Sequence, residues 1–101
     1  MNFKETVIQD IDVFFNDFAE PHKINGNSVD IVVDNDRLQH RSKKEYDGIV
    51  VGDTLIFIKK TDLSFVPKPD QAINYDGIPS LCFDVREDMG MYEIILKMNV
   101  S

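Results

Sequence analysis

The sequence has very little cysteine: one residue, Cys82, among 101. A single cysteine forms no internal disulfide, so nothing points to an oxidising compartment. Cys82 stands between Leu81 and Phe83, surroundings typical of a small core residue rather than a reactive thiol. We therefore expect the fold to be held together by its hydrophobic core.

Long apolar segments are also missing. No uninterrupted apolar run approaches the roughly 18 residues that a membrane-spanning helix needs. The opening residues Met1–Glu5 are not followed by the apolar region of a signal peptide. We expect the protein to work without a membrane, inside a cell or inside a particle assembled there.

Positive charge is scarce. Eighteen acidic residues stand against eleven Lys and Arg, which gives a formal net charge of −7. Such a surface keeps a protein soluble and repels phosphate backbones, which argues against broad nucleic-acid binding.

The residue patterns of catalysis are absent as well. There are two histidines, the expected surface residue His22 and His40, and neither lies in a catalytic motif. No glycine-rich phosphate loop occurs, and the acidic run of Asp30, Asp34 and Asp36 lacks the glycine and final glutamate of a calcium loop. Glu87-Asp88 reads as an exposed turn rather than an acid–base pair. We therefore predict a protein that is not an enzyme and that holds no cofactor or metal.

What the sequence does contain is enough apolar material for one domain spanning residues 1–101, since 43% of the residues are hydrophobic. The first segment predicts a helix over about residues 3–20, ended by Pro21. Its apolar side chains recur at helical steps of three and four and form one stripe. That stripe consists of Phe3, Val7, Ile11, Phe14 and Phe18, widened by Ile8 and Phe15.

From about residue 22 to residue 99 the pattern is that of short strands. Asn25-Gly26 and Asp76-Gly77 are typical of type I′ hairpin turns, Gly52-Asp53 suits a type II′ turn, and Gly90 suits a turn that needs positive φ. The expected strands are Ser28–Asp34, Gly48–Val51, Thr54–Lys60, Gln71–Tyr75, Ile78–Val85 and Met91–Met98.

Alternation within these strands predicts which side chains are buried. Leu81, Phe83 and Val85 are expected on one buried face, and so are Tyr92, Ile94, Leu96 and Met98 of the last strand. Leu55–Ile58 is apolar on both faces, which indicates a central strand. Tyr75 and Tyr92 are candidates for interface anchors, although strand tyrosines more often pack internally.

Two connections stand out. Thr61–Asp70 contains Pro67 and Pro69, which favour an extended segment. The segment 35–47 has no apolar periodicity, and we expect a flexible loop there. It carries four Lys or Arg within eight residues, in contrast to an otherwise acidic chain. The segment is either a solvated loop or a binding loop for an acidic surface or for DNA backbone. These candidate interface residues are Arg37, His40, Arg41, Lys43 and Lys44.

Together these patterns predict an α+β fold, with an N-terminal helix packed on a small antiparallel β-barrel or strongly curved sheet. The order of features resembles the small head-completion proteins of long-tailed bacteriophages and prophages, the head–tail joining or stopper subunits of the lambda and PBSX-like types. The resemblance spans most of the chain and consists of turn and core residues. Its residues are Phe14-Phe15 through Ala19-Glu20, Asn25-Gly26, Gly52-Asp53, Lys59-Lys60, Asp62-Leu63 leading to Pro67, Asp76-Gly77, Asp84 to Asp88, and Gly90 to Ile94.

This resemblance implies a structural virion component at the head–tail junction, made in the bacterial cytoplasm and placed in the virion neck. The subunit would self-associate into a ring below the portal, contact the portal or adaptor protein and the tail completion protein, and extend or close the DNA channel. By position, the segment 35–47 would be the loop that projects toward the channel, with DNA contact open to its basic residues. The alternative is a cytosolic protein- or peptide-binding module without catalytic activity.

Overall fold

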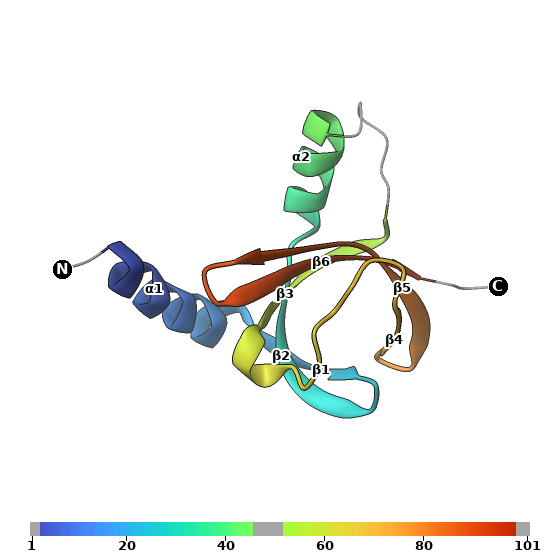
Figure 1. Cartoon of the computed structure of the whole chain (residues 1–101), viewed down its shortest axis with the longest axis horizontal. Helices are drawn as coiled ribbons and strands as arrows, with labels where there is room; N and C mark the ends of the chain where they lie inside the picture. Colours follow the sequence, from blue (N-terminus) through green and yellow to red (C-terminus); the bar gives the residue numbers. More distant parts are fainter. Residues whose placement is uncertain (1–2, 46–51, 99–101) are drawn as a thin grey trace.

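The computed structural model describes the backbone of residues 3–45 and 52–98, and the side chains of residues 11–40 and 52–98. Within these ranges, six strands and three helical segments follow one another (Figure 1). They are α1 (Phe3–Phe18), β1 (Glu20–Ile24), β2 (Asn27–Val33), α2 (Asn35–Glu45), β3 (Thr54–Lys59), the 3-10 helix η1 (Lys60–Asp62), β4 (Ala72–Tyr75), β5 (Ile78–Asp88) and β6 (Met91–Met98).

The strands form a closed antiparallel barrel in the order β1-β2-β3-β6-β5-β4. Three tight turns set its hairpins, and each begins with a non-glycine residue at positive φ followed by glycine: Asn25-Gly26, Asp76-Gly77 and Met89-Gly90. Positive φ at both central residues is what a type I′ turn requires, so the two predicted hairpin turns and the role of Gly90 are confirmed. The α+β prediction is likewise confirmed in its general form.

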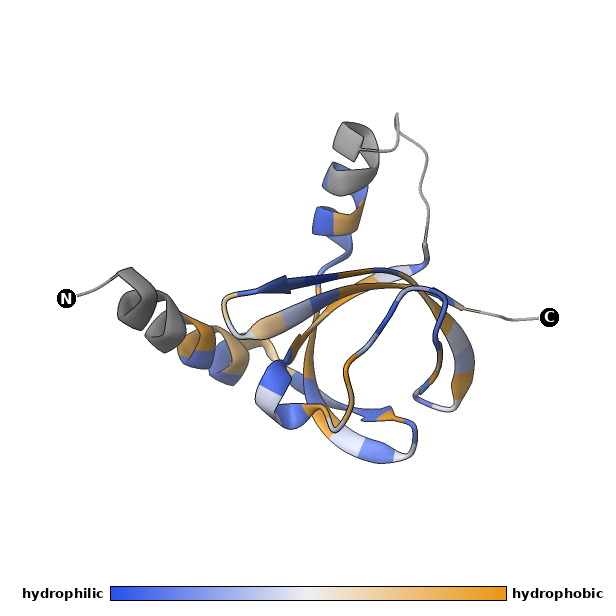
Figure 2. Ribbon diagram, viewed as in Figure 1, coloured by the Kyte–Doolittle hydropathy of each residue, from blue (hydrophilic) through white to orange (hydrophobic). Residues whose placement is uncertain are grey.

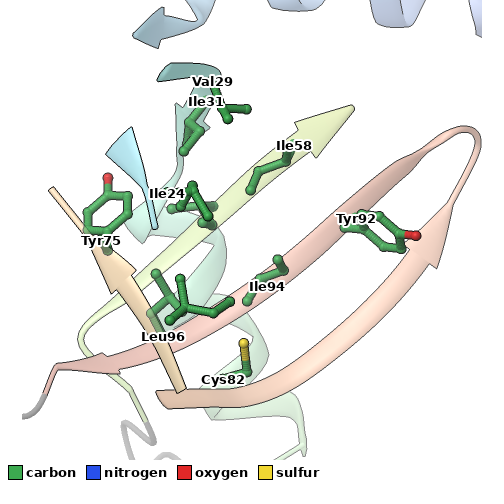
Figure 3. Packing of buried hydrophobic residues seen from close by; sticks show 11 residues of the cluster. Ile24, Val29, Ile31, Ile58, Tyr75, Cys82, Tyr92, Ile94 and Leu96 are labelled. Atoms are coloured by element: carbon green, nitrogen blue, oxygen red, sulfur yellow. The ribbon is translucent and has the colours of Figure 1, made fainter. Parts of the chain in front are cut away.

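The inside of the barrel is one apolar core. Figure 3 shows Ile24 of β1, Ile58 of β3, and Ile94 and Leu96 of β6 converging in this core. Cys82 is fully buried among them, as predicted, and burial raises the pKa of its thiol to about 11. The other buried members are Val29, Ile31, Ile56, Ile73, Tyr75 and Tyr92. The two tyrosines are therefore core residues of the barrel.

A second core lies on the outer wall of the barrel. There Ile11 and Phe15 of α1 pack against Leu55 and Phe57 of β3, together with Val32, Leu38 and Ile95. β3 thus supplies Ile56 and Ile58 to the inner core and Leu55 and Phe57 to the outer one, which confirms its prediction as a central strand. At roughly 25 cal/mol per Å² of apolar surface, burial on both faces makes β3 a major contributor to stability, as it does β6.

Three predictions of local structure were wrong. The helix stops at Phe18, and the chain enters β1 at Glu20, so Pro21 lies inside a strand that the sequence did not reveal. Gly52 does not adopt positive φ, so it does not begin a type II′ turn. It lies instead against β6, where a Cβ atom would overlap the Ile95 side chain. The predicted strand Gly48–Val51 lies outside the described residues.

The side chains of β5 that face the core also differ from those predicted. Leu81 and Phe83 are 42% and 41% exposed, whereas Cys82 between them is buried. A bulge between Cys82 and Asp84 shifts the register against β6, and Val85 beyond it packs against the inner core. An extra residue in one strand reverses which side chains face inward, and a strict alternation of two does not anticipate this.

Candidate interface formed by helix α2 and the adjoining groove

The segment predicted as a flexible loop over 35–47 is helix α2 as far as Glu45, and residues 46 and 47 lie outside the described ranges. Its start is fixed by a side-chain cap, because Asp34 Oδ1 accepts a hydrogen bond from the Arg37 N–H at 3.0 Å. The Asp34 N–H donates to the Leu55 carbonyl at 2.9 Å. Asn35 Oδ1 accepts from the Thr54 hydroxyl at 3.0 Å and from the Leu55 N–H at 3.2 Å. The base of α2 is thereby tied to the beginning of β3.

A single apolar residue completes this attachment. Leu38 is the only apolar residue of α2, and it is 3% exposed in the outer core. Every other position of the helix is polar or charged, and the described part of α2 is mostly hydrophilic (Figure 2). Beyond its base the helix projects away from the barrel (Figure 1). A polar helix held only at its base adds little to the core, which leaves its length available for contacts with other molecules.

The basic residues picked out from the sequence all lie on this helix. Arg37 and His40 have exposed side chains, while the side chains of Arg41, Lys43 and Lys44 lie outside the described ranges. The helical repeat aligns positions 37, 40, 41 and 44 along one side, since they are separated by steps of three and four. Position 43 falls off that line. What the sequence presented as a scattered basic loop is thus a helical array.

Arg37 has a buried partner. Its Nε lies 2.5 Å from Oε1 of Glu93 on β6, and the Glu93 side chain is 5% exposed while that of Arg37 is 50% exposed. The guanidinium also lies 5.7 Å from the centre of the Phe57 ring. Because a buried carboxylate is costly without a charged partner, Arg37 stabilises the subunit as well as contributing charge to its surface.

Beside this ion pair lies a groove of about 370 Å³ between α1, the base of α2 and the β5–β6 hairpin. Its apolar lining comes from Ile11, Phe14, Phe57 and Met91. Its charged lining comes from Asp34, Arg37, Asp88 and Glu93. Three carboxylates therefore face one guanidinium around an apolar floor. No residue pattern in the sequence indicated this groove, because its residues come from five separate elements of the chain.

A second polar cluster, around His22, lies where β1 meets β4. His22 is half-buried rather than a surface residue: its Nδ1 lies 2.6 Å from Asp76 Oδ2, and its ring stacks on Tyr75. Hydrogen bonds from His22 and from the Lys23 N–H hold the pKa of Asp76 below its ordinary value. Burial, and then the nearby Asp76 charge, raises the pKa of Tyr75, so its hydroxyl stays protonated. This cluster joins β1 to β4, where Ile24 and Tyr75 are the paired residues.

The other candidates for chemistry lie apart from one another. Glu87 pairs with Lys60 at 3.0 Å on the outside of the barrel. Among the residues whose side chains are described, no group of three or more His, Cys, Asp or Glu is placed to hold a metal ion. Neither helix, over its described residues, has the length and apolar character needed to cross a membrane.

No protein-family model matches the chain, and no curated protein matches it. Among solved structures, the chain is similar to the crystal structure of the ATP-binding sugar transporter-like protein from Salmonella typhimurium. The two proteins are 13% identical in sequence and superpose with a TM-score of 0.59 over 96% of this chain and 92% of that one. At this identity the likeness concerns the fold alone, and function has to be argued from the residues of the site.

Proposed function

We propose that this protein is a structural subunit of the head–tail junction of a bacteriophage or prophage particle. In this role it assembles as a ring below the portal, completes the head, extends or closes the DNA channel, and docks the tail. The resemblance of its turn and core residues to head-completion proteins is the starting point of the proposal. The barrel with a projecting helix supplies a plausible geometry for such a subunit, because the barrel wall and the helix present different surfaces to different neighbours.

The observation that carries the proposal is the anchoring of α2. The helix is held at its base by the Asp34 cap, by Asn35 and by Leu38, and it concentrates basic residues in one part of a chain whose net charge is −7. Opposite charges on two parts of one subunit favour a defined orientation when copies or neighbouring proteins meet. Weak contacts of this kind become a firm attachment when many act together in a ring.

The test is electron microscopy of particles made without this chain and then supplied with purified protein. We expect DNA-filled heads without tails, and tailed particles after addition of the wild-type protein. A variant carrying Arg41→Glu, Lys43→Glu and Lys44→Glu should fail to restore tails. Arg37 is left unchanged, because its replacement would also disturb Glu93.

The matched control is a variant with three charge reversals at exposed lysines outside α2, namely Lys23, Lys68 and Lys97. It has the same net charge as the α2 variant, so it should restore tails if the position of the charge matters. Normal tailed particles in the absence of the chain would refute the junction role. Equal failure of both variants would show that net charge, rather than α2, is required.

The groove supports a second candidate, a cytosolic protein- or peptide-binding module. Grooves with an apolar floor and a few charged groups are common sites for protein segments. A stable one-to-one complex with a host protein, together with normal phage assembly in the absence of the chain, would favour this function over the first.

A further inference from the structure

We infer that the groove between α1, α2 and the β5–β6 hairpin docks a short amphipathic segment of a partner protein, one that presents apolar side chains and a Lys or Arg. The inference rests on the proposed function, because the docked segment would belong to a protein that lies next to this one in the assembly. Its evidence is the lining of the groove, which no residue pattern in the sequence had pointed to.

The floor of the groove is apolar and partly open. Phe14 of α1 packs edge-to-face on Phe57 of β3, with ring centres 5.9 Å apart. Phe14 and Met91 are only half-buried, although both belong to the outer core. Their exposed faces form a surface that gains from being covered by another apolar group.

The charged side chains around this floor determine whether a positively or a negatively charged ligand fits. Among the lining residues whose side chains the structure describes, Arg37 supplies a guanidinium that is bound to Glu93, and Asp34 and Asp88 supply the other charges. Asp34 Oδ1 is the cap of α2, and Asp88 is exposed at the end of the β5–β6 hairpin. Carboxylates on an apolar floor attract a cation, so a partner segment that carries a Lys or Arg fits these residues.

The protein already contains an example of the expected contact. Arg37 enters the groove with its guanidinium beside a carboxylate and near the face of an aromatic ring. Guanidinium groups favour this combination of an ion pair and a cation–π contact. A cation from a partner would meet Asp88 at the opposite rim, while apolar neighbours on the same segment would cover Phe14 and Met91.

The volume of the groove favours a protein segment over a small cation as its ligand. A volume of about 370 Å³ is larger than an ammonium group needs, and it falls at the lower end of the roughly 300–1,000 Å³ range of ligand sites. Two walls of the groove are helices, and an amphipathic segment laid between them places side chains at helical spacing on the floor. We therefore expect recognition to require both an apolar face and a positive charge.

The test uses purified protein and a fluorescein-labelled amphipathic peptide of leucine and lysine, about 14 residues long so that a helix can form. Fluorescence anisotropy should show binding of this peptide. Peptides in which every lysine is replaced by glutamate, or every leucine by glycine, should not bind. Spermidine, a cation without an apolar face, should compete only weakly.

Two substitutions assign the binding to the groove. Asp88→Asn should weaken binding about three- to tenfold, since one charged contact at a surface is lost. Asp30→Asn removes the same charge from an exposed position on β2 outside the groove lining, and it should leave binding unchanged. Met91→Gln keeps the size of the side chain but makes the floor polar, and it should weaken binding as well.

Equal weakening by Asp88→Asn and Asp30→Asn would overturn the inference, because it would show general attraction to an acidic protein. Binding of the leucine-free peptide at the same strength would overturn it too. Neither result depends on phage particles, so failure of the groove is distinguishable from failure of the junction role. The particle experiment with the α2 variant tests that role separately.

Discussion

The ion pair between Arg37 and Glu93 should contribute measurably to stability, because one of its two members is buried. The Glu93 side chain is 5% exposed, so removing the guanidinium would leave a carboxylate that water reaches poorly. A hydrogen bond to a charged group contributes about 1.5–3 kcal/mol to stability. The Arg37 side chain is half exposed, and water entering its place would keep the loss near the lower part of that range. We predict that Arg37→Ala lowers the free energy of unfolding by about 1–3 kcal/mol.

The assay is a double-mutant cycle of Arg37→Ala, Glu93→Gln and the two together, followed by urea and thermal unfolding. In a domain of this size, a loss of 1 kcal/mol lowers Tm by about 4–8 °C. The second substitution should cost much less in the Arg37→Ala background than in the wild type, since the buried charge has then been removed. Arg37→Lys should recover part of the loss, because lysine restores the charge but not the planar geometry.

The same cycle examines the link between this pair and α2. If Arg37 fixes the base of the helix, Arg37→Ala should speed hydrogen exchange at the Leu38 amide, whose N–H faces the Asp34 carbonyl at 3.4 Å. A change in stability below about 0.5 kcal/mol, within the range of ordinary surface substitutions, would refute the reasoning. So would additive effects in the cycle, because they would mean that the two groups do not interact.

Three further predictions concern the barrel. Gly52→Ala should lower the free energy of unfolding by about 1–3 kcal/mol in urea titrations, because its Cβ would overlap Ile95. Cys82 should react with iodoacetamide at pH 8 far more slowly in the native protein than in urea, since its pKa of about 11 leaves about one thiolate in a thousand. Asp76→Asn should destabilise the fold at pH 5. That difference should disappear as the pH falls through the folded pKa of Asp76, because a carboxyl whose pKa is lowered on folding stabilises only above that pKa.

The parts of the fold that the sequence predicted are those set by neighbouring residues. Asn25-Gly26 and Asp76-Gly77 specify their turns because both positions require positive φ, which few other pairs accept. The run Leu55–Ile58 predicted a central strand because only a strand covered on both faces can bury every side chain. These inferences needed no knowledge of distant contacts.

Helix α2 was not predicted, because contacts with residues distant in the sequence stabilise it. One apolar residue, Leu38, gives no periodicity, and a polar stretch of this kind forms an isolated helix poorly. Its stability comes from partners far along the chain: Thr54 and Leu55 bind Asn35, and Glu93 binds Arg37. The Asp34 cap was the one local signal that could have indicated a helix start.

The candidate residues were identified correctly as a basic group, but their arrangement was not. In a loop, all five candidate residues would have equivalent positions: Arg37, His40, Arg41, Lys43 and Lys44. In the helix, Arg37 lies at the base and the other four lie further along. The base of α2 is occupied by Arg37, whose charge is partly committed to Glu93 inside the subunit. Reversing all the basic residues together would therefore mix a folding defect with a binding defect.

The basic side of α2 and the groove share one residue. Arg37 belongs both to the basic side of α2 and to the lining of the groove. If the cation of a bound segment reached past Asp88 to Glu93, it would compete with Arg37, and loosening that pair would release one of the attachments at the base of α2. Occupancy of the groove and the orientation of α2 are then linked, and by linkage each must influence the other to the same extent. Hydrogen exchange at the Leu38 amide, measured with and without the leucine–lysine peptide, should show this coupling in the wild-type protein. It should be absent in Arg37→Ala, where the attachment has already been lost.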